Sequence, residues 1–245
     1  YTLSLHDALP ILKRAQEKMH TNYPIIVIDR IYHVEPATMK TVIWQELEKR
    51  KRKPDTILAA MGFCGGVWDQ VRAQVRTVIP RVDDCVSLLL ATDDRYIPNR
   101  KESGHLYLYE DEPEKFSVLS LLKDYRKASK EFQGLDEETL FHMWFDQYYF
   151  LDIIDTGYND CYELAYAEQA QKNADMIHAA LDYVQGSNRI LEKLVSGEWD
   201  EQFLVAEPGH LIRHGIFSEW KRMFQPRDLA FLEGLVLFLC KMERC

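Results

Sequence analysis

The sequence predicts an α/β protein with Rossmann-like lobes, in which parallel strands are joined by helical crossovers, followed by a helical C-terminal tail. Two observations predict this class. Short β-branched apolar runs alternate with segments whose apolar residues recur at helical spacing, an order typical of parallel sheets. Several of the runs end in polar or glycine-rich turns, where proteins of this class place their sites. The two halves repeat a similar order of elements, which favours two lobes.

The first half is predicted to hold three buried strands, over residues 23–28, 56–61 and 78–79, because β-branched runs end there in turn signals. Helices are expected around them. Leu12 starts a helical pattern that continues to residue 20, and Pro36 opens a second helix at a position that proline tolerates. The valines at positions 67, 71 and 75 predict a third helix over 67–77. Residues 86–91 form a short apolar element, and 105–109 alternate as an edge strand does.

The second half is predicted to repeat this alternation after a helical, aromatic-rich connection. Strands are expected over 150–154, 181–184 and 203–206, with helices over 162–180 and 188–195. We therefore divide the chain into a first α/β lobe over 12–115, a helical connection over 116–149, a second α/β passage over 150–215 and a helical tail over 216–245.

The first eleven residues resemble the translation of a common sequencing adapter, as an assembly of metagenomic reads can contain. We expect residues 1–11 to be an artefact and exclude them from fold reasoning, as one excludes a fusion scar. The first lobe is then truncated at its N-terminus, and a first strand is missing. On this interpretation His6 and Asp7 are not catalytic.

Composition excludes several classes of function. The 245 residues carry a net charge of −9, which argues against a nucleic-acid partner, since such proteins need a basic face. The longest apolar stretch, 229–240, is about half of the ~20 residues that span a membrane. Five irregularly spaced cysteines indicate a reduced, cytoplasmic protein. The expected partner is a small molecule or a metallocofactor; a partner protein and the oligomeric state stay open.

Two cysteines follow predicted strands and form the centre of the first functional hypothesis. Cys64 follows the strand over 56–61, Cys85 follows the strand over 78–79, and His33 follows the strand over 23–28. The carboxyl ends of parallel strands meet at one sheet edge, so these three side chains can converge. Thiolates and imidazole suit zinc, copper(I) or an iron–sulfur centre. The metal ligands are therefore predicted to be Cys64, Cys85 and His33.

A cysteine nucleophile is the first alternative. Cys64 would precede the helix predicted from residue 67, whose N-terminus would lower the pKa of its thiol. The amides of Gly65 and Gly66 would stabilise an oxyanion. The other members of the catalytic set would be His33 as base and Asp83 or Asp84 as the group that orients it.

Non-catalytic binding of a small anion is the second alternative. Glycine-rich turns that lead into helices offer N–H groups to phosphate or carboxylate. The cradle would comprise Gly62, Gly65, Gly66 and Arg81, with Gly209 from the other lobe.

The chain also resembles a named family, the domain of unknown function 1638 of bacteria and archaea, over residues 25–211. The blocks that carry the resemblance are Tyr32-His-Val-Glu-Pro36, Gly62-Phe-Cys-Gly-Gly66, Ile79-Pro-Arg-Val-Asp-Asp-Cys85, Ser103-Gly-His-Leu-Tyr107, Gly186-Ser-Asn-Arg-Ile-Leu191 and Gly197-Glu-Trp-Asp-Glu-Gln-Phe-Leu-Val205 with Pro208-Gly209. The resemblance implies no established reaction, but it implies an association with corrinoid-dependent methyl transfer.

Two departures from the family pattern bear on the site. Family members usually begin with a strand that ends in a cysteine turn, where this chain has the adapter-like segment. They also usually carry a histidine just before the last motif cysteine, where this chain has Asp84. The resemblance therefore implies that Cys64 and Cys85 belong to a site that has a third cysteine in relatives.

Overall fold

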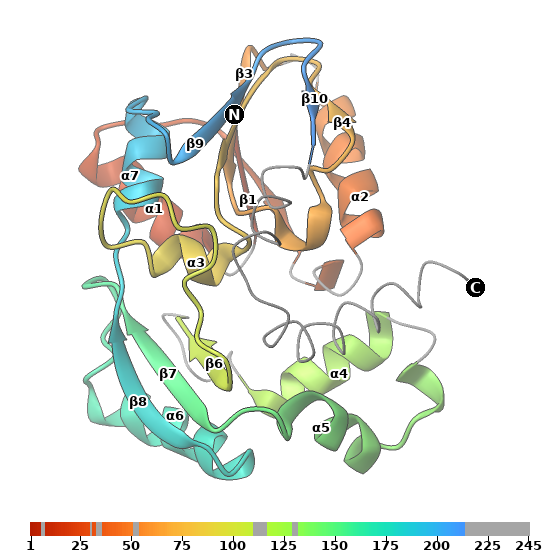
Figure 1. Ribbon diagram of the computed structural model, residues 1–245, viewed down its shortest axis with the longest axis vertical. Coiled ribbons are helices and arrows are strands. Elements are labelled where there is room, and N and C mark those ends of the chain that lie inside the picture. Colours follow the sequence, from red (N-terminus) through yellow and green to blue (C-terminus); the bar gives the residue numbers. More distant parts are fainter. Residues whose placement is uncertain are drawn as a thin grey trace, which may run out of the picture.

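The computed structural model describes residues 1–5, 8–29, 31–32, 36–50, 54–109, 117–128 and 132–213 (Figure 1). Two sheets built mainly of parallel strands and flanked by helices dominate this part of the chain, so the predicted α/β class is confirmed. His33, residues 6–7 and the predicted helical tail over 216–245 lie outside the described residues. Among the helices that are described, none is long and apolar enough to cross a membrane.

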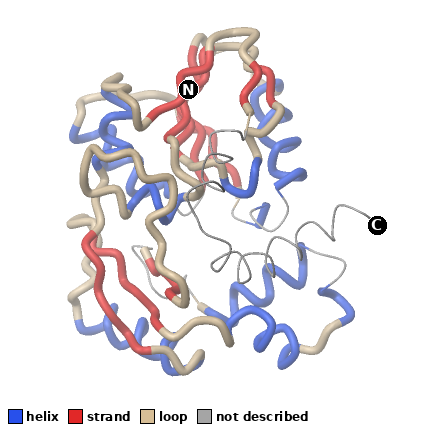
Figure 2. Tube along the Cα trace, in the orientation of Figure 1, coloured by secondary structure: helices blue, strands red, loops and turns tan. Residues whose placement is uncertain are grey.

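The larger sheet has five strands in the order β2-β1-β3-β5-β9. Figure 2 draws the strands in red and the helices in blue. The first four are parallel, and β9 closes the edge in the antiparallel sense. The carboxyl ends of four neighbouring strands therefore lie at one edge of this sheet. The strands are β1 (Thr2–Leu5), β2 (Ile25–Ile28), β3 (Thr56–Ala60), β5 (Arg76–Pro80) and β9 (Phe203–Ala206).

Part of the adapter-like segment forms a strand inside this sheet. Leu3 pairs with Ile26 of β2 and with Ala59 of β3, and its side chain is fully buried. Helix α1 (Leu9–Lys18) begins within the same segment. The adapter origin of residues 1–11 stays a prediction, and in the structure β1 fills the position between β2 and β3.

Helices cover both faces of the five-stranded sheet because its buried strands alternate apolar side chains between the faces. Ile57 and Ala59 of β3 face helix α2 (Pro36–Glu48). Leu58 and Ala60 face the opposite way, toward α1 and helix α7 (Arg189–Ser196). Hydrophobic side chains fill both interfaces, and this three-layer packing holds the strand ends in place.

The smaller sheet has three parallel strands in the order β6-β7-β8, with the predicted edge strand β6 at its side. One face packs on α4 (Val118–Ala128), α5 (Glu137–Phe145) and α6 (Leu164–Met176). From the other face, Tyr107, Tyr109 and Ile154 join the core formed by α1, α3 and α7, so the two sheets share a hydrophobic core. The remaining elements are β6 (His105–Leu108), β7 (Phe150–Asp155), β8 (Ala180–Gln185), α3 (Cys85–Leu89), the short pair β4 (Val71–Arg72) and β10 (Leu211–Ile212), and the 3₁₀ turns Cys64–Gly66 and Phe132–Gly134.

The helix predicted over 67–77 is wrong. Residues 67–70 form a turn, and β4 follows and pairs with β10. Gln70 has a φ of +54°, a left-handed conformation that cannot continue a right-handed helix. The valine spacing was misleading because Val67 is buried in the turn and Val71 on the inner face of β4. Cys64 therefore begins a short 3₁₀ turn and does not stand before an α-helix.

Candidate functional site

The two cysteines singled out in the sequence meet at the edge of the larger sheet. Cys64 lies four residues beyond β3 and Cys85 five residues beyond β5, and these two strands are neighbours. Their sulfur atoms are 4.0 Å apart. Both side chains are buried, with 6% and 5% of their surfaces exposed. The convergence that parallel strand ends predict is therefore present for Cys64 and Cys85.

Backbone contacts hold the two cysteine turns against each other. The N–H of Phe63 donates to the carbonyl of Val82 at 2.9 Å, and the N–H of Cys64 donates to the carbonyl of Asp83 at 2.7 Å. A Cβ atom at Gly62 would lie 2.7 Å from the Val82 carbonyl oxygen and 2.8 Å from the Asp84 nitrogen. Only glycine allows the backbones to approach so closely.

The turn that carries Cys64 has an unusual backbone. Cys64 has a φ of +42°, and Gly65 and Gly66 continue at +71° and +91°. A left-handed conformation is uncommon for a residue with a Cβ atom, and such residues concentrate at functional sites. The buried indole of Trp68 supports this turn by donating its Nε1–H to the carbonyl of Gly62 at 3.2 Å.

Charged residues stand beside Cys85. The carboxylate of Asp84 accepts the N–H of Ser87 at 2.8 Å and so caps helix α3. The ammonium of Lys101 pairs with Asp84 and lies 3.3 Å from the carboxylate of Asp83. Burial opposes the charge of Lys101, but the two carboxylates outweigh it and raise the pKa of its ammonium. Burial and the charge of Asp84 raise the pKa of Asp83.

The Cys64 thiol is held in its protonated form. Its contact with the sulfur of Cys85, its burial and the negative charge of Asp84 together raise its pKa well above the ordinary value, although a contact with the Gly62 backbone opposes them. A nucleophilic cysteine requires the opposite shift. A metal ion can still replace the proton, since thiols lose theirs when they coordinate.

The sulfur geometry fits a shared metal ion. Two zinc–sulfur bonds of about 2.3 Å at a tetrahedral angle place their sulfurs about 3.8 Å apart. The observed 4.0 Å is close to this separation. In the part of the chain that the structure describes, no group of three or more histidine, cysteine or acidic side chains can hold a metal. Of the three predicted ligands, the described residues include Cys64 and Cys85, and His33 lies outside them.

The predicted anion cradle stays a prediction, but several of its groups already have partners within the protein. The amide of Gly66 already donates to the carbonyl of Phe63 at 2.9 Å. The guanidinium of Arg81 stacks over the ring of Tyr96, 5.4 Å from its centroid. Gly209 donates its N–H to Ala73, next to β4. Arg81 directly precedes Val82 in the turn that leads to Cys85, whereas the contact of Gly209 is with Ala73.

Sequence reasoning missed a second polar pair, in the smaller sheet. His105 Nδ1 and Asp152 Oδ2 lie 2.7 Å apart, and the imidazole stacks on Phe150 with 4.5 Å between ring centroids. Burial raises the pKa of Asp152. His105 lies in one of the blocks quoted for the family resemblance, and this was the signal that could have drawn attention to it. Sequence reasoning also missed Lys101, because this residue lies in no recognisable motif.

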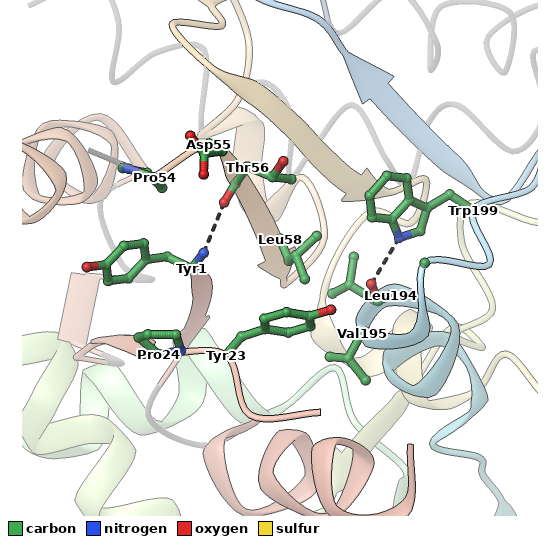
Figure 3. Close-up of a pocket in the computed structure, with 11 residues that line it drawn as sticks. Tyr1, Tyr23, Pro24, Pro54, Asp55, Thr56, Leu58, Leu194, Val195 and Trp199 are labelled. Atoms are coloured by element: carbon green, nitrogen blue, oxygen red, sulfur yellow. Dashed lines mark hydrogen bonds between the residues drawn. The ribbon is translucent and has the colours of Figure 1, made fainter. Parts of the chain in front are cut away.

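The cavity drawn in Figure 3 lies at the other end of the larger sheet. Its volume is about 550 Å³, and it opens where β1, β2 and β3 begin. There the amino group of Tyr1 donates to the carbonyl of Thr56 at 3.0 Å. On the opposite wall, Trp199 donates to the carbonyl of Leu194 at 2.9 Å. Since the cysteines follow the carboxyl ends of the strands, this cavity is separate from them.

Fold and site together define an α/β protein with a pair of buried cysteines at the carboxyl edge of a parallel sheet. Residues 27–195 match the family described as protein of unknown function (DUF1638), and the chain belongs to this family. A search of curated proteins and a search of solved structures each found no match.

The raised pKa of Cys64 predicts a pH dependence of stability. In the unfolded chain the thiol ionises at its ordinary value, while the folded state retains the proton. The contribution to stability is therefore complete below about pH 8.5 and is lost as the pH rises further, by up to about 1.4 kcal/mol per pH unit. Urea unfolding of metal-free protein at a series of pH values measures it. Cys64→Ser should flatten the decline, and an equal slope in both proteins would contradict this assignment.

Asp84 caps helix α3, and this predicts that its replacement lowers the stability of the fold. Asp84→Ala should lower the free energy of unfolding by about 1–2 kcal/mol, because α3 loses its cap. Asp84→Asn keeps a cap acceptor and should lose less. Thermal unfolding of both variants makes the comparison, and equal destabilisation by alanine and asparagine would show that the cap contributes nothing.

Proposed function

We propose that this protein binds a transition-metal ion or a metallocofactor through the thiolates of Cys64 and Cys85. The observation that carries the proposal is the 4.0 Å separation of two buried sulfurs on neighbouring strand ends. Zinc is the first choice of metal, and copper(I) and iron–sulfur centres share its preference for thiolates. The metal would neutralise both thiolates in a region from which water is largely excluded.

His33 remains the proposed third ligand. Strand β2 ends at Ile28, two strand positions from β3, a separation of about 10 Å at the usual strand spacing. After β2 the chain turns, since Ile31 and Tyr32 form a 3₁₀ turn and the N–H of Tyr32 donates to the carbonyl of Asp29 at 3.2 Å. His33 directly follows this turn. The backbone of the Cys64–Gly66 turn and the carboxylates of Asp83 and Asp84 would then surround the metal.

The proposal includes the biological setting that the family resemblance and the composition imply. We place the protein in the cytoplasm, in corrinoid or methyl-group metabolism, with a small molecule or a metallocofactor as its partner and not nucleic acid. Among the described residues, Cys64, Cys85 and Cys161 are not joined in disulfides, which suits a reducing compartment. A cysteine-nucleophile enzyme and an anion-binding protein have less support. The pKa of the Cys64 thiol is raised, and the Gly66 amide and the Arg81 guanidinium already have partners within the protein.

Metal analysis tests the proposal. Protein purified without added metal is expected to carry about one transition-metal ion per chain, measured by inductively coupled plasma mass spectrometry. The double variant Cys64→Ser/Cys85→Ser should lose it. Cys161→Ser is the matched control, because Cys161 is equally buried but lies in the core of the smaller sheet. Wild-type protein without stoichiometric metal, or equal metal in the double variant, would refute the proposal.

A further inference from the structure

We propose that Cys64 and Cys85 are also a thiol–disulfide exchange site, which reacts with a low-molecular-weight disulfide when no metal is bound. The two sulfurs are already 4.0 Å apart. A disulfide bond needs about 2.05 Å, so each sulfur has to move only about 1 Å. This inference concerns the residues of the proposed metal site but does not require that a metal binds.

The backbone around the pair favours bond formation. The hydrogen bond from the Cys64 amide to the Asp83 carbonyl fixes the two turns side by side, two residues from Cys85. The close approach of the Gly62 backbone to Asp84 is a second contact between the same two turns. The two cysteines are 21 residues apart in the chain, so in the unfolded protein they meet only at the entropic expense of closing a loop. Folding removes this barrier.

The exchange needs no reactant besides the small disulfide, which accepts the two electrons. One cysteine loses its proton, and its thiolate attacks a sulfur of the small disulfide, which releases one thiolate of the small molecule. The second cysteine loses its proton and attacks the protein sulfur of this mixed disulfide. The second small thiolate then leaves. The protein has lost two protons and two electrons, and the small disulfide has been reduced to two thiols.

The burial of the pair sets the conditions of the reaction. Because both side chains are buried, a small disulfide has limited access to the sulfurs and the exchange is slow. A metal ion that occupies both sulfurs blocks the reaction, and the disulfide in turn removes both thiolate ligands, so metal binding and oxidation exclude each other.

Glutathione redox buffers test the inference. The full chain is used with Cys161, Cys240 and Cys245 replaced by serine, so that only the pair can react. Metal-free protein is brought to equilibrium from two starting states. In one the protein is fully reduced, and in the other it is oxidised in the unfolded state and then refolded. Mass spectrometry of the digested protein should show a linked peptide pair, two hydrogens lighter, which dithiothreitol separates.

The outcomes separate this inference from the proposed function. The inference is supported if the Cys64–Cys85 bond forms in the reduced protein and persists in the oxidised protein, even if metal analysis finds no metal. Its formation should stop when one equivalent of zinc is added, if the metal site is also real. A pair that ends reduced from both starting states in every buffer, or that is found only as separate glutathione adducts, overturns the exchange site and leaves the metal proposal standing. In the Cys64→Ser variant, Cys85 should form only the glutathione adduct.

Discussion

Replacing either Cys64 or Cys85 by serine is expected to weaken zinc binding by about 100-fold or more. Loss of an outer partner of a ligand already lowers metal affinity about 10- to 100-fold, and each substitution here removes a ligand itself. Since the two sulfurs are adjacent and equally buried, both variants should be affected to a similar degree. Competition with a chromophoric chelator measures the affinity.

Two controls separate loss of a ligand from loss of the fold. Cys161→Ser changes a buried cysteine in another core and should keep the wild-type affinity. The far-ultraviolet circular dichroism of both site variants should match the wild type. Wild-type affinity in either serine variant would show that its sulfur is not a ligand.

Replacing Gly62 by alanine is expected to give the largest loss of stability among conservative substitutions near the site. The added methyl group would lie 2.7–2.9 Å from backbone atoms of Val82 and Asp84, which cannot move aside as a flexible side chain can. Overpacking of this kind lowers the free energy of unfolding by about 1–3 kcal/mol or more. Urea unfolding gives the change.

The same substitution links stability to function. To admit the methyl group, the two cysteine turns must separate, and the distance between the sulfurs of Cys64 and Cys85 must change with them. Zinc affinity should therefore fall in Gly62→Ala although no ligand is removed. Gly134→Ala is the matched control, because a Cβ atom there meets nothing within 4 Å. Equal stability of the two variants would contradict the close approach of the turns.

The sequence allowed the strands of the site to be predicted because their signals are local. The β-branched runs that became β3 and β5 are bounded by turn residues, and the rule that parallel strand ends converge then brought Cys64 and Cys85 together. Strand β1 was missed for a different reason. Its residues were set aside because of their supposed origin, and their buried pairing became visible only in the sheet.

The errors of the sequence analysis have physical causes. Val67 and Val71 have the spacing of a helix, but a left-handed residue at Gln70 ends any helix, and no local pattern announces it. Lys101 could not be identified because its partners, Asp83 and Asp84, lie some seventeen residues away across a loop. Long-range ion pairs leave no periodic trace in a single sequence.

X-ray absorption spectroscopy at the zinc edge tests the central claim most directly. The zinc-loaded protein is predicted to show two sulfur neighbours at about 2.3 Å, with nitrogen or oxygen in the remaining positions. Cys64→Ser and Cys85→Ser should each reduce the sulfur count by one. A zinc ion surrounded only by nitrogen and oxygen at about 2.0–2.2 Å would show that Cys64 and Cys85 are not its ligands.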